Sequence, residues 1–432
     1  MIGSMLAARS LWKPVLQRLV TGRAARFRMT PRTPPFPVGL ERAGLYLHVP
    51  FCRNLCSFCP YNRVEYDPVL FGRYERAVCQ EIEAYAPHLR GTHFVSLYVG
   101  GGTPTVNPSG LLRILEHLRK TLDVSCDICV ELHPAHMDEE VLVALKDVGV
   151  TLLSVGVEST SDQILERIGR NHSGEMALQA LHRARAVGFD TVNADLMFAL
   201  PGQTLDHWKH DVLAVLAEGV DQVSTYPMFT FPYSERGRQL GTRVVERPDG
   251  STIRSMLRFT DEACRARGLR RCAVWSWQRP SSQKFSSITR HHYVGFGPSA
   301  ATMNGAHFYV NTFDVAAYAD SLPERLPVAL SMEVNRRLEM AYWLYWRVYE
   351  LFVSDSDFRS VFGAHESLTD RFGHLFGPLR AAGLARRATG GYAITPTGAY
   401  WIHRLQNEYS LNYINRLWGT CRRSPWPAEA VL

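Results

Sequence analysis

The sequence predicts an α/β protein: a partial (β/α)6 barrel of the TIM type, followed by a mostly helical, winged-helix-like domain. Two observations predict the barrel. From residue 44 onward, short apolar segments alternate with amphipathic helical patterns, as parallel strands joined by right-handed crossovers do. This alternation occurs six times, which suits an incomplete barrel. A third observation, the aromatic-rich helical pattern beyond residue 305, predicts the second domain.

The predicted strands are short apolar segments separated by loops and helical patterns. They cover residues 45–49, 96–100, 127–132, 152–158, 191–198 and 222–227. The predicted helices include residues 111–122, 139–149, 176–188 and 207–219. A chain of 432 residues is longer than one typical domain. We therefore divide it into an N-terminal extension (1–40), the barrel (41–304) and a C-terminal helical domain (305–432).

One face of several predicted strands is polar, because successive side chains of a strand point to opposite faces. The polar or small residues that share a face are Thr191, Asn193 and Asp195, then Ser154, Gly156 and Glu158, and finally Cys129 and Glu131. A closed barrel normally fills its interior with branched apolar side chains. Here the apolar faces should meet the helices, so the polar faces should line a wet, occupied cavity.

The C-terminal region follows a different pattern. Residues 331–352 are predicted to form a helix rich in aromatic residues, whose usual role is core packing. Residues 367–411 are predicted to form a helix, a second helix, a short hairpin and a last helix. This order is similar to that of a winged-helix domain.

The positive charge is concentrated at one end of the chain. The net charge is +7, and seven of the 48 basic residues lie in residues 1–40 without any acidic residue. The remainder is formally neutral, which argues against a chain-wide surface for nucleic acid. No apolar stretch approaches the roughly 20 residues of a membrane span. The nine cysteines are clustered or scattered rather than arranged as a disulfide framework, which favours a reducing cytoplasm.

Residues 1–40 combine an Arg-rich, acid-free amphipathic start with a proline-rich segment, and we expect them to be disordered. Such a start resembles an organelle transit peptide. The alternatives are a disordered bacterial extension, or a misassigned start for which Met29 is the true initiator.

Three cysteines occupy one short loop, "CRNLCSFCPY" (52–61), at the spacing C-x3-C-x2-C. Thiolates hold iron–sulfur clusters, usually four for each cubane. Three leave one iron with an open coordination site for a substrate or cofactor. Structural zinc is the rival, but it takes four protein ligands. The loop offers no fourth Cys or His, and the nearby His48 stands on a strand.

This loop, with the aromatic Phe58 before its last cysteine, is similar to the signature of radical S-adenosylmethionine (SAM) enzymes. The resemblance implies that Cys52, Cys56 and Cys59 are the catalytic residues and hold a [4Fe–4S] cluster. The open iron of that cluster chelates SAM. Reductive cleavage of SAM then gives a 5′-deoxyadenosyl radical, with the electron supplied by a donor such as flavodoxin or ferredoxin.

Four further segments, in order, resemble the HemN-like (oxygen-independent coproporphyrinogen III oxidase-like) branch of the superfamily. They are "GGGTPT" (100–105), "ELHP" (131–134), "SVGVESTSDQILERIGRNH" (154–172) and "NADLMFALPGQT" (193–204). The resemblance spans roughly residues 43–300. The cofactor contacts that it implies are Tyr46, Phe58, Tyr61, Gly101, Gly102, Thr103, Glu131, Glu158, Arg170 and Asp195. Residues 293–304 resemble the segment that completes the pocket, where a second SAM would bind.

Two residues depart from the oxidase pattern: Glu158 replaces a Gln, and Tyr61 replaces a Cys. The resemblance to HemN-like enzymes that use two SAM molecules then favours C-methylation or cyclopropanation of an sp² carbon in a specialised metabolite. The alternatives are coproporphyrinogen III oxidation, radical opening of haem by a haem-degrading methyltransferase, and a HemW-like haem chaperone. The expected partner is a small planar or unsaturated substrate, with no nucleic acid and no membrane.

Overall fold

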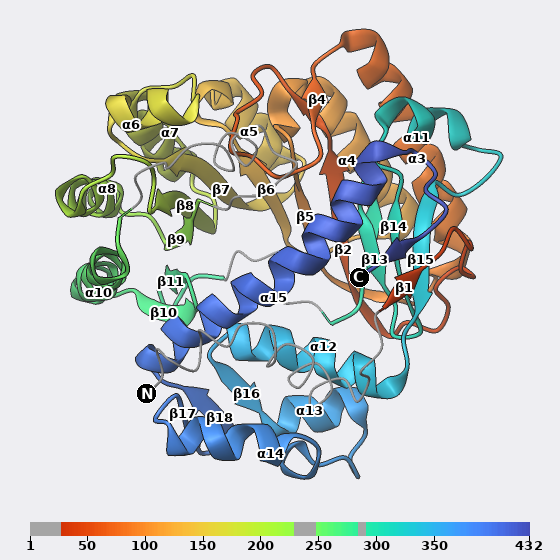
Figure 1. Ribbon diagram of the computed structural model, residues 1–432. Helices are drawn as coiled ribbons and strands as arrows, with labels where there is room; N and C mark the ends of the chain where they lie inside the picture. Colours follow the sequence, from red (N-terminus) through yellow and green to blue (C-terminus); the bar gives the residue numbers. More distant parts are fainter. Residues whose placement is uncertain (1–26, 229–247, 284–290) are drawn as a thin grey trace.

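The computed structural model describes residues 27–228, 248–283 and 291–432, and its centre is a twelve-stranded sheet (Figure 1). Six strands of this sheet are parallel and neighbour one another in chain order. They are β2 (Arg42–Val49), β5 (His93–Gly101), β6 (Ile128–Leu132), β7 (Val150–Glu158), β8 (Thr191–Phe198) and β9 (Gln222–Pro227). Each coincides with a predicted strand to within a few residues, so the predicted α/β class and strand order are confirmed.

The sheet extends beyond these six strands on both sides. Next to β2 lies a seventh parallel strand, and three antiparallel strands follow it: β12 (Tyr293–Phe296), β13 (Ala301–Met303), β14 (His307–Asn311) and β15 (Val328–Glu333). Next to β9 lie β11 (Ser276–Gln278) and β10 (Arg270–Ala273), both antiparallel. The sheet therefore continues past residue 304, where the sequence suggested a boundary. Among the described residues, no strand pair closes β10 onto β15.

Helices cover the outer face of the parallel strands (Figure 1). They are α3 (Pro68–Tyr85), α4 (Pro108–Leu122), α5 (Glu139–Asp147), α7 (Gly174–Val187), α8 (Leu205–Ala217), α10 (Gly250–Ala266) and α11 (Val315–Ser321). The short helix α6 (Asp162–Ile168) instead packs against Cys56 and Phe58. Local sequence sets their ends. The Asn107 side chain accepts from the Gly110 N–H and Pro108 opens α4, while α7 ends at Gly188 in the left-handed conformation.

The apolar faces of the strands pack against these helices. Val155 and Val157 of β7 and Val192 and Leu196 of β8 are fully buried in the main core. Their neighbours on the opposite face are polar, as the period of two in the sequence predicted. The hydrophobic core therefore lies between sheet and helices, and the other face is left for a site.

The C-terminal residues form a smaller unit with its own core. It contains α12 (Arg336–Tyr349), β16 (Phe352–Ser354), α13 (Asp355–Phe362), α14 (Leu368–Ala381), β17 (Ala385–Ala388), β18 (Gly391–Ile394) and α15 (Pro396–Arg423). Two expectations are corrected here. Residues 331–333 belong to β15, and the helix begins only after Asn335 caps it. The two helices expected after residue 367 are one, because α14 runs through Pro378 without a break.

Two short strands join the ends of the described chain. β1 (Arg28–Met29) pairs with β19 (Ala430–Val431), and Thr30 pairs with Ser331 of β15. Met29 is fully buried beside Leu330 and Leu417. The expected disorder of residues 1–40 is therefore wrong for residues 28–30, which are ordered by partners some 300–400 positions away. Residues 1–26 lie outside the described part of the chain.

Candidate active site

A polar layer lies on the inner face of β7, β8 and β9, near the middle of these strands. Ser154 Oγ donates to Asp195 Oδ2 (2.5 Å), and Asn193 Nδ2 donates to Ser154 Oγ (2.6 Å) and to Asp195 Oδ1 (2.9 Å). Ser224 Oγ of β9 donates to Asn193 Oδ1 (2.9 Å). Neighbouring strands thus contribute their polar faces to one hydrogen-bonded group, as the strand parity predicted.

A less polar layer of side chains lies next to the polar layer, on the side of the amino ends of the strands. Tyr98, Cys129 and Leu152 form a small buried cluster with Tyr46 packed against it. The Tyr98 hydroxyl donates to Glu131 Oε1, and the Tyr46 hydroxyl is 2.8 Å from His48 Nδ1. Cys129, which strand parity grouped with the polar side chains, therefore lies in an apolar cluster, while Glu131, Ser154 and Asp195 lie further toward the carboxyl edge of the sheet.

The cysteine loop caps this edge. Cys52 ends β3 (Phe51–Cys52), which pairs with β4 (Val64–Glu65), and the N–H of Cys59 donates to the carbonyl of Cys56 (3.3 Å). The guanidinium of Arg63 binds the backbone of this loop. Its Nη1 donates to the carbonyl of Cys59 (3.0 Å) and its Nη2 to that of Cys56. Thr103 Oγ1 lies 3.5 Å from the sulfur of Cys52.

Burial keeps the thiols of Cys52 and Cys59 protonated unless a metal binds them. Burial raises the pKa of the Cys52 thiol, and it raises the pKa of Cys59 to about 11 against the opposing field of Arg63. Without a metal both thiols would be protonated at neutral pH, whereas metal coordination deprotonates a thiol. The nine cysteines form no disulfide.

The spacing of the thiols argues against a single ion. Zinc holds sulfur at about 2.3 Å, which places tetrahedral ligands about 3.8 Å apart. Among the described residues, one set of three His, Cys, Asp or Glu side chains has its ligand atoms within 4.8 Å of one another, and it does not include these cysteines. Three thiols on one loop, two of them buried and one partly buried, instead suit an iron–sulfur cluster.

A buried ion pair lies beside the loop. Arg170 Nη2 is 3.7 Å from Glu158 Oε1, and both side chains are less than 10% exposed. Arg170 Nη1 lies 4.0 Å from the sulfur of Cys56, its Nη2 also donates to the carbonyl of Gly156, and its buried Nε has no partner. The guanidinium therefore faces the cysteine loop with unused hydrogen-bonding capacity.

Glu158 is held in an uncommon backbone conformation. Its φ is 65°, the left-handed region that non-glycine residues rarely adopt, and a β-bulge lies between Gly156 and Glu158. The Tyr226 hydroxyl donates to Glu158 Oε2 (2.7 Å). Burial raises the pKa of Glu158, while Arg170 and Tyr226 oppose this shift. Such strain at the end of a strand is typical of a functional position.

The glycines of residues 100–105 let the chain fold closely over the cysteine strand. Gly101 has φ 119°, and a Cβ there would lie 2.7 Å from the ring of His48. A Cβ on Gly102 would lie 2.5 Å from the carbonyl oxygen of Phe51. The Gly101 N–H lies 3.3 Å from Glu131 Oε2. The contacts that a side chain at these positions would break are with the protein itself.

The structure brings most of the candidate residues to this edge. The cysteines, Gly101, Gly102, Thr103, Glu131, Glu158, Arg170 and Asp195 meet there, with Tyr46 one layer below. Phe58 packs into an apolar cluster with Ile164 and Leu165. Tyr61 is 48% exposed with its ring 6.2 Å from that of Trp418 on α15. Its hydroxyl faces the site, where burial and then the charges of Glu131 and Asp195 raise its pKa.

Three residues of the site were missed in the sequence. They are Tyr98, which donates to Glu131, His48, whose ring lies next to Gly101, and Arg63, which donates to the backbone of the cysteine loop. Strand parity could have found Tyr98, which shares a face with Gly100. No local pattern marks Arg63, because its contacts depend on the path of the loop.

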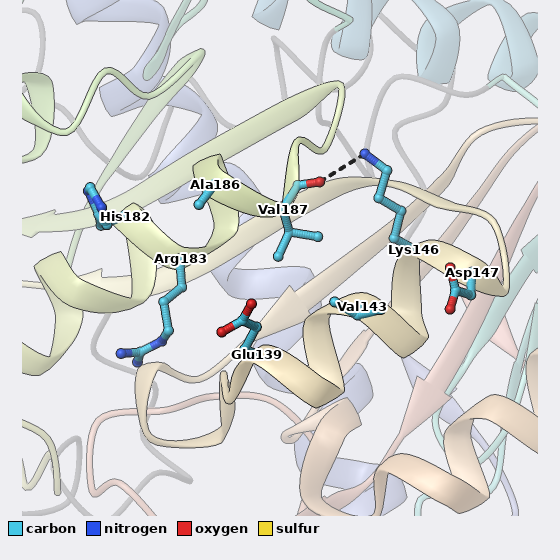
Figure 2. Close-up of a pocket in the computed structure, with 8 residues that line it drawn as sticks. All are labelled: Glu139, Val143, Lys146, Asp147, His182, Arg183, Ala186 and Val187. Atoms are coloured by element: carbon cyan, nitrogen blue, oxygen red, sulfur yellow. Dashed lines mark hydrogen bonds between the residues drawn. The ribbon is translucent and has the colours of Figure 1, made fainter.

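A pocket of about 330 Å³ lies elsewhere, on the outer face between α5 and α7 (Figure 2). Two of its basic side chains donate to backbone carbonyl groups. Lys146 Nζ donates to the carbonyls of Val187 (3.0 Å) and Gly188, and Arg183 Nε donates to that of Met137 (3.0 Å). No reactive group converges there, so the pocket is a surface hollow.

Comparisons with known proteins agree with this geometry. The model of the radical SAM superfamily matches residues 46–214. The chain is 30% identical over 326 residues to the heme chaperone HemW of Mycobacterium tuberculosis, covering 70% of this chain and 81% of the relative. It is 29% identical over 301 residues to the oxygen-independent coproporphyrinogen III oxidase of Pseudomonas aeruginosa, covering 64% and 65%.

The solved coproporphyrinogen III oxidase (HemN) of Escherichia coli has a similar fold, with a TM-score of 0.74 and 22% identity over 89% of this chain and 94% of that chain. An α/β sheet with thiols at its carboxyl edge and this set of relatives define a radical SAM protein. The chain belongs to the HemN-like branch of the radical SAM superfamily. No helix in the described ranges has the length and apolar character to cross a membrane.

The polar layer predicts a pH-dependent stability of the ligand-free protein. Burial, with added repulsion from Glu158 and Glu131, raises the pKa of Asp195 to about 8, although Ser154 opposes the shift. The folded state therefore binds a proton that the unfolded state, with a pKa near 3.9, releases. The stability that this proton confers is present below about pH 4 and is lost as the pH rises through about 8.

We expect Asp195→Asn to flatten this dependence. Urea unfolding from pH 4 to pH 9 measures it: the difference in unfolding free energy between the variant and the parent should grow by a few kcal/mol as the pH rises. A difference that stays constant across this range would contradict the assignment.

Proposed function

We propose that this chain is a radical SAM enzyme that holds a [4Fe–4S] cluster through Cys52, Cys56 and Cys59. The observation that carries the proposal is the position of these three thiols beside a buried guanidinium, Arg170, and a layer of carboxylates. When bound, the cluster and SAM supply a 5′-deoxyadenosyl radical, which removes a hydrogen atom from a substrate. An electron donor such as flavodoxin or ferredoxin would provide the electron.

The residues around the thiols would bind and orient SAM. Arg170 would pair with its carboxylate, because the guanidinium retains an unpartnered Nε and lies beside Cys56. Asp195, which is fixed by Ser154 and Asn193, would accept from the ribose hydroxyls. Glu131 is fixed by Tyr98 and lies beside the Gly101 N–H, where it would accept from the amino group.

For the reaction itself we propose carbon transfer from a second SAM to an sp² carbon, as C-methylation or cyclopropanation. The substrate would be a small planar or unsaturated metabolite, in a reducing cytoplasm. Two departures from the oxidase pattern support this choice. Glu158 adds a buried carboxyl where a Gln is expected, and Tyr61 adds a phenol hydroxyl near Glu131 and Asp195 where a Cys is expected.

Haem binding is the second candidate, because relatives named HemW match this chain at 28–30% identity. Porphyrinogen decarboxylation is the third, supported by the relative named as an oxidase. Both functions would use the same edge of the sheet. Decarboxylation would release a product that carbon transfer does not, and haem binding would consume no SAM.

Product analysis with methyl-deuterated SAM separates the three. The anaerobically reconstituted protein is reduced and incubated with SAM alone, with coproporphyrinogen III, or with haem. Carbon transfer predicts deuterium in 5′-deoxyadenosine together with S-adenosylhomocysteine. Carbon dioxide without S-adenosylhomocysteine would favour decarboxylation, and stoichiometric haem binding without SAM consumption would favour the chaperone. Absence of 5′-deoxyadenosine under every condition would overturn the enzyme proposal.

A further inference from the structure

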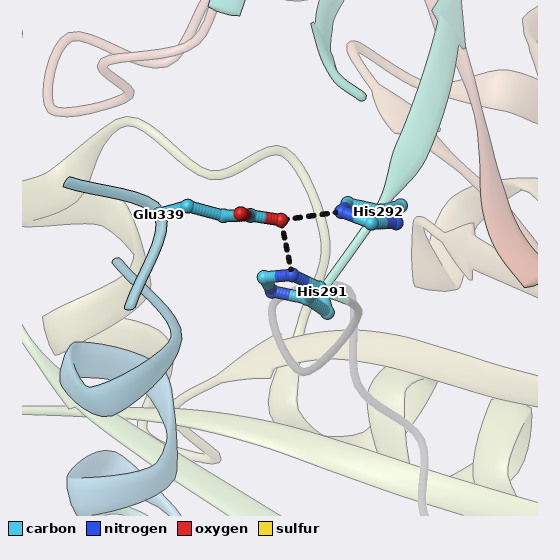
Figure 3. A group of neighbouring side chains, drawn as sticks. All are labelled: His291, His292 and Glu339. Atoms are coloured by element: carbon cyan, nitrogen blue, oxygen red, sulfur yellow. Dashed lines mark hydrogen bonds and ion pairs between the residues drawn. The ribbon is translucent and has the colours of Figure 1, made fainter. Parts of the chain in front are cut away.

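Three potential metal ligands from two distant segments meet where the sheet contacts the C-terminal unit (Figure 3). His291 and His292 precede β12, and Glu339 lies in the first turn of α12. The Nε2 atoms of both imidazoles lie 3.1 Å from the same oxygen, Glu339 Oε1. All three ligand atoms lie within 4.8 Å of one another.

The separations match those of ligands on one small ion. Zinc binds imidazole nitrogen at about 2.0–2.1 Å and carboxylate oxygen at about 2.0–2.2 Å, which places neighbouring tetrahedral ligands about 3.3 Å apart. Both nitrogen–oxygen distances here are 3.1 Å. Two histidines and one glutamate are also an established ligand set for zinc, with water in the fourth position.

The surroundings favour a built site over a chance surface contact. The side chains of His291, His292 and Glu339 are only 13%, 24% and 10% exposed. Gly305 faces them with φ 84°, and a Cβ there would lie 3.0 Å from His292 Nε2 and 3.1 Å from Glu339 Oε1. Arg336 Nη1 is 3.6 Å from the other carboxylate oxygen, Oε2, so it can orient the glutamate without occupying the ligand oxygen.

The position within the sheet separates this cluster from the cysteine loop. The Gly44 N–H donates to the carbonyl of His292 (2.9 Å), so His292 lies level with the amino end of β2. The cysteine loop follows Val49, five residues further along the strand, or about 17 Å at 3.3 Å per residue. The cluster is therefore at the amino edge of the parallel strands, the edge associated with stability in barrels.

We propose that His291, His292 and Glu339 bind one zinc ion that fastens α12 to β12. The ion joins the sheet to the C-terminal core, because the His291 ring also packs edge-on against Phe362 of that core (5.4 Å). With water in its fourth position, the ion would link the two elements through three protein ligands. This site stands independently of the reaction proposed above.

Zinc titration of the reconstituted full-length protein tests the proposal, with zinc sulfate as the probe and a fluorescent chelator as competitor. We expect one zinc per chain in addition to the cluster iron. His292→Ala and Glu339→Gln should each weaken zinc binding by more than about 100-fold, since loss of outer-sphere partners alone costs 10–100-fold. His292→Cys, which keeps a ligand, should retain the ion. His182→Ala, at an exposed histidine paired with Glu218, is the matched control.

Thermal unfolding supplies the second measurement. A chelator should lower the unfolding midpoint of the parent protein but not that of Glu339→Gln, with the cluster absorbance serving as a check on folding. Failure to bind zinc beyond the iron content, or equal zinc binding by His292→Ala, would overturn the proposal. A third result would also overturn it: Glu339→Gln lowers the unfolding midpoint, but the chelator does not change the midpoint of the parent protein. Hydrogen bonds between the three side chains, without a metal, would give that result.

Discussion

Replacement of Cys52, Cys56 and Cys59 by alanine abolishes both iron binding and SAM cleavage. This is the largest effect that we expect, because these thiols would be the protein's ligands to the cluster and Cys52 and Cys56 are buried at the edge of the site. Anaerobic reconstitution with iron and sulfide, followed by iron analysis and assay of 5′-deoxyadenosine, measures it. The parent should hold four irons per chain and the triple variant none.

A matched control separates loss of ligands from loss of any thiol. Cys79→Ala removes a partly buried cysteine from α3, outside the loop. It should leave iron content and SAM cleavage unchanged. If the triple variant retained four irons, the cluster would be bound elsewhere and the assignment of these three cysteines as its ligands would be wrong.

The second large effect is expected from Arg170→Gln. The variant leaves Glu158 buried without its cation, and breaking a buried pair costs about 3–5 kcal/mol of unfolding free energy. SAM cleavage should fall at least about 30-fold, because truncating a buried charged partner costs about 2 kcal/mol or more of binding. Iron content should remain, since Arg170 contributes no thiol. Urea unfolding, iron analysis and a SAM cleavage assay together measure these effects.

The double variant Arg170→Gln/Glu158→Gln distinguishes the two roles of the guanidinium. Removal of the uncompensated carboxylate should restore most of the lost stability, while SAM cleavage stays low if Arg170 binds the cofactor. Recovery of both properties would show that Arg170 is only the partner of Glu158. Glu158→Gln alone keeps an acceptor for the Tyr226 hydroxyl and is the matched control.

The periodic features of the sequence were sufficient for the parallel sheet. Each of the six strands is a local apolar segment of alternating faces, so its position and its polar side could be predicted from residues close together in the chain. The same parity placed Glu131, Ser154 and Asp195 on the inner face, where the structure has Glu131 hydrogen-bonded to Tyr98 and Ser154 to Asp195. The C-terminal unit was less predictable. Its strand β15 and helix α12 follow directly on one another where a single helix was expected, and α14 is one helix where two were expected.

Other parts of the site depend on contacts between distant segments. Arg63 faces the cysteine carbonyls only because β3 and β4 pair. The C-terminal end of α15 reaches the same loop, where Arg422 Nη2 donates to the carbonyls of Pro60 (2.9 Å) and Tyr61 (2.8 Å). The backbone of Tyr61 is therefore fixed against α15, which its place in the loop did not indicate.

The sequence by itself determined the class of this protein, since the spacing of three cysteines and a strand period of two are local properties that the chain carries in any conformation. Only the tertiary structure decided how the charges are neutralised and which distant groups meet: Glu158 against Arg170, Met29 against β15 and α15, and the two histidines against Glu339. The physical reason is that these contacts are made across sequence separations at which neither hydrophobic periodicity nor motif spacing carries information.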